Sequence, residues 1–91
     1  MPKYLIEREI PGIGSQSAEE LRAAAQTSND VLSTMAPRAQ WQQSFITGDK
    51  VYCVYIAENE RAVYEHAELS GFPADRVSKV EAILDPASAQ T

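Results

Sequence analysis

The sequence predicts a single α+β domain with the element order β-α-β-β-α-β. Two stretches have the periodicity of amphipathic helices, and each begins at a residue suited to capping a helix. Alternating or apolar stretches precede, separate and follow them. In this order two helices pack on one face of a four-stranded antiparallel sheet, which is the ferredoxin-like arrangement. A swapped or extra strand is the alternative that the pattern leaves open.

The first half of the chain contains a strand and the longer helix. Residues Lys3–Ile10 alternate as a strand does, and proline and glycine residues then end it. Ser17 and Glu20 have the spacing of a capping box, in which each side chain bonds the other residue's backbone N–H. Apolar residues at helical spacing continue from there to Met35, shortly before a proline.

A β-hairpin is predicted next. Its strands are Trp41–Thr47 and Val51–Ile56, joined by a short turn at residues 48–50. Strict alternation would place Trp41, Gln43 and Phe45 on one face of the first of these strands.

The second helix and the last strand complete the order. Asn59 can cap a helix that runs to Ser70, and Gly71 suits the left-handed position that closes a helix. A final strand is expected from Val77 to Leu84, ending before a proline.

Length and composition indicate one domain, residues 1–86, with a small, polar tail at 87–91 that we expect to be frayed. The net charge of −5 argues against a nucleic-acid partner, because phosphate binding needs a basic patch. No apolar run approaches the ~18 residues of a membrane span, and we expect no membrane partner. The strand pattern begins almost at the first residue, leaving no room for a signal peptide. We therefore expect a soluble, cytoplasmic protein.

Val51–Ile56 carries no charged residue on either face. An antiparallel sheet with one wet face should alternate polar and apolar residues, so both faces of this strand are expected to be covered. The helices can cover only one face. A second copy of the chain, packed sheet to sheet, is the expected cover for the other, which predicts a homodimer. A small-molecule ligand in the resulting hollow is a further alternative.

Glu7 and Glu9 fall on the face of the first strand that the helices leave open. A carboxylate in the middle of such a surface needs a partner, because burying an unpaired charge is costly. Two interpretations stay open for Glu7: an ion pair with Lys79 or with Arg8 of a partner subunit, or a role as metal ligand or acid–base group.

His66, the only histidine, lies within an apolar helical stripe. It is either a satisfied core residue or a ligand. Neither Ala62 nor Ser70, four residues away on each side, offers a second ligand, so a metal site must combine distant strands or two subunits. Cys53 has no cation in its own strand and is expected to behave as a small apolar residue.

Several short motifs occur in a characteristic order. They are Met1–Arg8 (MPKYLIER), Ser17–Leu21 (SAEEL), Val51–Cys53 (VYC), and His66 followed by Gly71–Asp75 (GFPAD). Together they make residues 1–86 resemble a family of small bacterial proteins classed as a domain of unknown function, whose best-known members bind nickel.

The resemblance implies a ferredoxin-like homodimer and a divalent metal such as nickel as its cofactor. The expected metal ligands are then His66, Glu7 and Glu9. The nickel-binding members carry additional histidines, including one in the junction where this chain has Phe72. Because nickel prefers imidazole ligands, the metal site of this chain is expected to be weakened, altered or lost.

These observations predict a small homodimeric binding protein related to the nickel binders, more in keeping with binding than with catalysis. The alternative is a cofactor-free enzyme, resembling dimeric ferredoxin-like monooxygenases or isomerases. In that case Glu7, His66 and Tyr55 are the acid–base candidates in a hollow between sheet and helices. A structural or interaction module is the third possibility.

Overall fold

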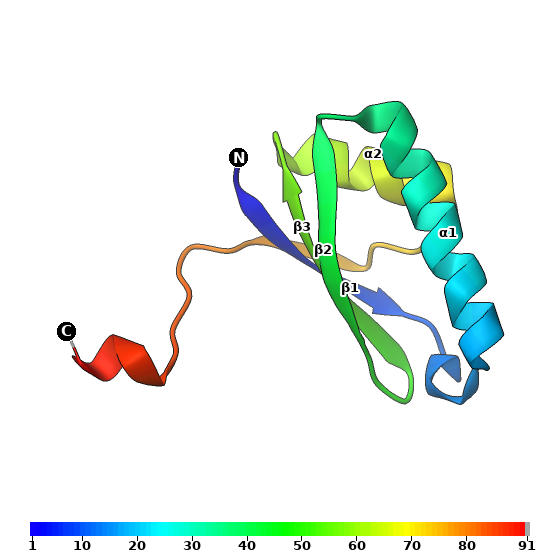
Figure 1. Cartoon of the computed structure of the whole chain (residues 1–91), viewed down its shortest axis with the longest axis horizontal. Helices are drawn as coiled ribbons and strands as arrows, with labels where there is room; N and C mark the ends of the chain where they lie inside the picture. Colours follow the sequence, from blue (N-terminus) through cyan, green and yellow to red (C-terminus); the bar gives the residue numbers. More distant parts are fainter. Residues whose placement is uncertain (91) are drawn as a thin grey trace.

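A computed structural model describes residues 1–90 and has the predicted element order (Figure 1). Its elements are β1 (Lys3–Glu9), η1 (Ile13–Ser15), α1 (Ala18–Met35), β2 (Ala39–Ile46), β3 (Lys50–Ala57), α2 (Glu60–Ser70), β4 (Arg76–Lys79) and η2 (Pro86–Gln90). The strands form one antiparallel sheet in the order β2-β3-β1-β4. The predicted βαββαβ fold with its four-stranded sheet is confirmed.

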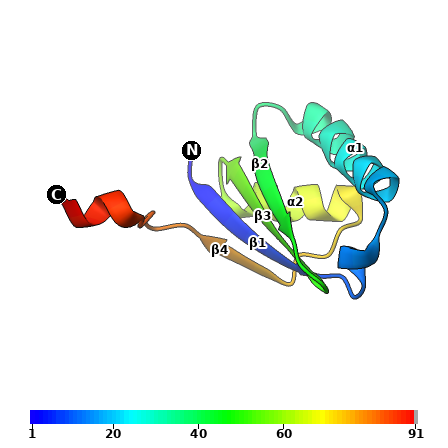
Figure 2. The same ribbon diagram turned by 60° about the horizontal axis from the view of Figure 1, so that its bottom comes forward.

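Both helices cover the same face of the sheet, and the other face is left open (Figures 1 and 2). The core lies between the two layers, where every second residue of the central strands β1 and β3 is buried. Residues of β1, α1, β3 and α2 are among the most buried in this core: Ile6, Met35, Tyr55, Ala57, Ala62, Val63 and His66. None of the helices within residues 1–90 is long and apolar enough to cross a membrane.

The ends of both helices follow the local signals in the sequence. The Oγ of Ser17 accepts a hydrogen bond from the N–H of Glu20 at 3.1 Å, and the Glu20 carboxylate accepts one from the N–H of Ser17 at 3.0 Å. The amide oxygen of Asn59 accepts from the N–H of Ala62 at 2.9 Å. Gly71 closes α2 at φ +80°, a left-handed conformation that favours glycine.

Strand β2 contains a β-bulge that the sequence pattern did not indicate. Trp41 pairs with Tyr55, whereas Gln43 pairs with the adjacent residue Val54. The extra residue between them reverses the alternation, so Trp41 faces the helices while Gln43 and Phe45 face the open side. The expectation that Trp41, Gln43 and Phe45 share one face is therefore wrong.

The last strand is much shorter than predicted. β4 ends at Lys79, which pairs with Tyr4, and the N–H of Val80 still donates to the carbonyl of Lys3 at 2.8 Å. Because β1 begins at Lys3 and the strands are antiparallel, later residues have no neighbour in β1 to pair with. The following segment, including Leu84, leaves the domain (Figure 2). Within the expected tail, residues 87–90 belong to η2, and residue 91 lies outside the described part of the chain.

The loop between β1 and α1 is held against the β2–β3 hairpin. The N–H of Gly12 donates to a carboxylate oxygen of Asp49 at 2.9 Å, and the N–H of Gly14 donates to the carbonyl of Gly48 at 3.1 Å. A Cβ at Gly14 would lie only 2.7 Å from the carbonyl oxygen of Thr47, so the close approach requires glycine there. This contact fixes the loop and buries Ile13 beside the sheet.

Candidate ligand-binding site

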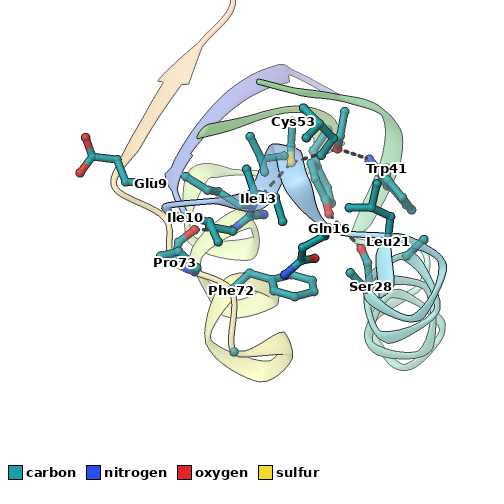
Figure 3. A pocket seen from close by; sticks show the side chains of 18 of the residues that line it. Glu9, Ile10, Ile13, Gln16, Leu21, Ser28, Trp41, Cys53, Phe72 and Pro73 are labelled. Atoms are coloured by element: carbon teal, nitrogen blue, oxygen red, sulfur yellow. Dashed lines mark hydrogen bonds between the residues drawn. The ribbon is translucent and has the colours of Figure 1, made fainter. Parts of the chain in front are cut away.

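A cavity of about 600 Å³ lies between the helix-facing side of the sheet, α1 and the segment that follows α2 (Figure 3). This volume is in the range of sites that hold small organic ligands. Most of its wall is apolar: Ile10, Pro11, Ile13, Leu21, Ala24, Ala25, Trp41, Ile46, Val51, Phe72 and Pro73. The polar residues that line it are Arg8, Glu9, Gln16, Ser28, Ser44, Cys53 and Tyr55. An apolar enclosure with a few converging polar groups is typical of a ligand-binding site.

Arg8 is the charged residue enclosed in this wall, and only 3% of its surface is exposed. Its Nη1 donates to the carbonyl of Pro73 at 2.7 Å, and its Nε donates to the Sγ of Cys53 at 3.4 Å. The guanidinium carbon lies 5.8 Å from the centre of the Phe72 ring. Among residues 1–90, no carboxylate lies within 4.0 Å of Arg8. The buried cation thus has neutral partners only.

The position of Arg8 follows from the alternation of β1. Tyr4, Ile6 and Arg8 are the buried residues of the strand, so all three point toward the helices. In the sequence, Arg8 is a charge that interrupts an otherwise apolar strand face. That interruption is the signal in the sequence for a functional residue, but alternation alone does not show what the charge would bind.

A hydrogen-bonded cluster of three buried or nearly buried side chains adjoins the cavity. The Oγ of Ser28 lies 3.0 Å from the hydroxyl of Tyr55 and 3.2 Å from the Nε2 of His66. Nε2 also lies 3.4 Å from the carbonyl oxygen of Ser28. The Tyr55 and His66 rings are tilted by 51° with centroids 5.0 Å apart. Ser28 from α1 thereby joins β3 to α2.

The surroundings keep this cluster uncharged. Burial lowers the pKa of the His66 imidazole below its ordinary value, and the nearby charge of Arg8 acts in the same direction. Burial likewise raises the pKa of the Tyr55 phenol, opposed by its hydrogen bond with Ser28. His66 is therefore neutral and Tyr55 protonated near pH 7. The Nδ1 of His66 has no hydrogen-bond partner within residues 1–90.

The predicted metal ligands are distributed over two faces of the sheet. His66 is 1% exposed and lies on the helix side. Glu7 alternates with the buried Ile6 and Arg8, so it lies on the open side, where its carboxylate is 3.9 Å from Nε of Arg76. Glu9 lies at the rim and points away from the cavity (Figure 3), with its carboxylate 3.9 Å from Nζ of Lys50.

A single chain does not bring the predicted ligands together. Within residues 1–90, no three His, Cys, Asp or Glu side chains form a group that could hold a metal ion. The donor set of His66, Glu7 and Glu9 in a single chain therefore does not fit a nickel site. Their role as metal ligands remains a prediction. Of the acid–base candidates, the structure brings His66 and Tyr55 together, but Glu7 is on the opposite face.

Cys53 packs at the cavity wall in a polar setting that its own strand did not suggest. Ser44 donates to its Sγ at 3.0 Å, and the indole N–H of Trp41 donates to the Ser44 hydroxyl at 2.9 Å. The cation that Val51–Ile56 lacks is supplied by Arg8 of the neighbouring strand β1. The hydrogen bond to Ser44 fixes the orientation of the Trp41 indole beside the bulge in β2.

The fold and the cavity define a small ferredoxin-like α+β protein with a half-open, mainly apolar cavity between sheet and helices. The chain belongs to the family described as nickel responsive protein SCO4226-like, whose family model matches residues 4–80. The crystal structure of SCO4226 from Streptomyces coelicolor A3(2) shares the fold, with a TM-score of 0.76 and 18% sequence identity over 90% of this chain and 99% of that one. No curated protein matches the chain. The resemblance seen in the sequence is confirmed.

Proposed function

We propose that the protein is a non-catalytic, homodimeric binding protein that encloses a small organic ligand in the cavity of each protomer. The observation that carries the proposal is the 600 Å³ cavity itself, which is lined mainly by apolar side chains and has a few polar groups in its wall. A hollow of this size is large for a 91-residue chain, and its half-open form gives a ligand a way in from solvent.

Binding is favoured over catalysis by the placement of the reactive groups. Tyr55 lines the cavity, but His66 lies behind it and Glu7 lies on the other side of the sheet. Within the described residues, the Ser28–His66 pair has no carboxylate on Nδ1 to orient the imidazole, as a Ser–His–acid site requires. The cofactor-free enzyme alternative therefore gains no support from this arrangement.

A homodimer is supported by the open face of the sheet. Leu5, Tyr52, Val54 and Ile56 are only half-buried there, and Phe45 is 53% exposed. In the segment after β4, Ile83 and Leu84 are 68% and 87% exposed. A second copy packed on the open face would remove the apolar surface of the sheet from water. Light scattering on purified protein should then give twice the 10.0 kDa mass of the chain, and a monomer would contradict the dimer.

The description of the family as nickel responsive is the reason to consider nickel as a second ligand. Because the predicted ligands lie on two faces of the sheet, we infer that this member binds nickel weakly. The ligand of the cavity is an organic molecule in our proposal, and the two binding events are separable by experiment.

The binding proposal is tested with three eight-carbon probes of equal length: octanoate, 1-octanol and octylamine. Trp41 lines the cavity and is the only tryptophan, so a ligand that enters should change its emission. We expect saturable binding of at least one probe. Ala25→Phe should fill the cavity and abolish it, whereas Ala23→Phe, on the exposed side of the same helix, should leave it unchanged. Absence of saturable binding by all three probes would overturn the proposal.

A further inference from the structure

A purely apolar ligand would not account for one feature of the cavity, which is the buried positive charge of Arg8. The side chain is 97% buried, since only 3% of its surface is exposed, and it lines the cavity. No carboxylate within residues 1–90 is in ion-pair distance of it. A buried charge is expensive unless it is paired, so an unpaired guanidinium in an apolar wall points to an anion that the chain itself does not supply.

The protein partners of Arg8 leave part of its donor capacity free. A guanidinium has five N–H donors in a planar fork. Within residues 1–90 its hydrogen bonds run from Nε to the Cys53 thiol and from Nη1 to the Pro73 carbonyl, and the Tyr55 hydroxyl is a further neutral neighbour of the guanidinium. Both acceptors are neutral. These two bonds hold the fork in place, as a preformed receptor for a carboxylate requires.

Building on the proposed function, we propose that the ligand is a monocarboxylate with an apolar body, its carboxylate paired with Arg8 and its body enclosed by the apolar wall. One buried cation balances one negative charge, whereas a dianion would leave a second charge buried without a partner. The Tyr55 hydroxyl, which also lines the cavity, is a further donor for the carboxylate when the Oγ of Ser28 donates to it.

The apolar part of the ligand has a defined place in the same cavity. Side chains from three separate parts of the chain form the wall around it: Ile13 before α1, Leu21 on α1, and Phe72 after α2 (Figure 3). Glu9, the acidic residue at the rim, points away from the cavity and is 3.9 Å from Lys50, so its charge is directed away from an entering anion. An amphipathic monoanion is therefore complementary to both the charge and the lining.

The three eight-carbon probes also test this assignment, because their headgroups are an anion, a neutral hydroxyl and a cation. The alkyl chain of octanoate is one carbon shorter than the other two, which works against the expected preference and so cannot produce it. In wild-type protein, octanoate should bind at least about tenfold more tightly than 1-octanol, the difference that one charge-assisted hydrogen-bonded pair provides, and octylamine should bind most weakly. This comparison needs no substitution and so does not depend on the folding of a variant.

Arg8→Met removes the charge and keeps an apolar stem of similar length. It should eliminate the preference for octanoate over 1-octanol while 1-octanol still binds. Arg22→Met removes one positive charge from the exposed side of α1 and should leave the preference intact. Far-ultraviolet circular dichroism checks that each variant is folded.

The outcomes separate the two proposals. If 1-octanol binds wild-type protein as tightly as octanoate, or if folded Arg8→Met keeps the preference, the carboxylate assignment is overturned while the binding proposal stands. If no probe binds, both are overturned.

Discussion

The Oγ of Ser28 lies 3.2 Å from the Nε2 of His66, and this contact ties the middle of α1 to α2 within the core. The same hydroxyl lies 3.0 Å from that of Tyr55 on β3. The three residues are far apart in the sequence and belong to three different elements. Their meeting point forms the inner boundary of the cavity, so its integrity should affect both the stability of the fold and the shape of the site.

Ser28→Ala should destabilise the protein by about 1–3 kcal/mol, because it leaves the Tyr55 hydroxyl and the His66 imidazole without their shared partner. Tyr55→Phe removes one of these bonds, and the double variant should be less destabilised than the sum of the single ones. Urea unfolding of all four proteins measures the coupling. Additive effects would contradict the hydrogen-bonded cluster.

The stability of the protein should fall as the pH drops below about 6.5, the ordinary pKa of histidine. Burial lowers the pKa of His66 in the folded state, so the unfolded chain binds a proton there first and folding becomes less favourable. His66→Gln should remove this dependence. The measurement is the urea midpoint at several pH values between about 7.5 and 5.5. This range is chosen because it brackets the ordinary pKa of histidine.

The two carboxylates with shifted pKa values, Glu20 and Glu65, do not interfere in that range. The pKa values of Glu20 and Glu65 are lowered from 4.5, Glu20 mainly by its hydrogen bonds at Ser17 and Glu65 mainly by its hydrogen bond with Arg38. Their stabilising contributions are present above 4.5 and are lost only at more acidic pH. An equal loss of stability in wild type and His66→Gln between about pH 7.5 and pH 5.5 would contradict the assignment to His66.

Gly71→Ala should destabilise the protein by about 1–2 kcal/mol, because alanine at φ +80° meets the steric penalty of the left-handed region. Gly48→Ala is the matched control. Gly48 has no positive φ, and a Cβ there would contact nothing within 4 Å. Thermal unfolding of the two variants should therefore show a lower midpoint for Gly71→Ala only. Equal midpoints would contradict the strained position.

A charge on the open face should dissociate the proposed dimer without unfolding the chain. Val54 is half-buried on that face, so Val54→Glu should give a folded protein of monomer mass by light scattering. Cys53→Glu places the charge in the core, where Cys53 is 5% exposed, and should unfold the domain. Ala23→Glu, on the exposed side of α1, is the control and should keep the dimer mass. A Val54→Glu dimer would contradict the interface.

Nickel titrated into metal-free protein should bind weakly at about pH 7.5, because one protomer lacks a group of three ligands within residues 1–90. His66→Gln and Glu7→Gln should leave the calorimetric signal unchanged, since the two side chains lie on opposite faces of the sheet. Tight binding that both variants weaken, and that is lost at about pH 5.5 as imidazole protonates, would instead establish the predicted ligands in a site between protomers.

Local signals in the sequence determined the elements and their order. Ser17 and Glu20 define the start of α1, Asn59 defines the start of α2, and Gly71 defines its end. Each of these signals acts through hydrogen bonds or backbone angles within a few residues, so it can be interpreted without knowledge of the rest of the chain. The apolar composition of Val51–Ile56 likewise indicated a strand with both faces in need of cover.

The tertiary structure decided the features that depend on distant partners. The bulge after Trp41 follows from the register between β2 and β3, and the early end of β4 follows from where β1 begins. The same holds for the site. Arg8 is buried beside Cys53, whereas Glu7 lies on the opposite face of β1. Which of the two is buried depends on the side of β1 that the helices cover. Sequence alternation separates two faces of a strand, but only the packed layers determine which of them becomes the inside.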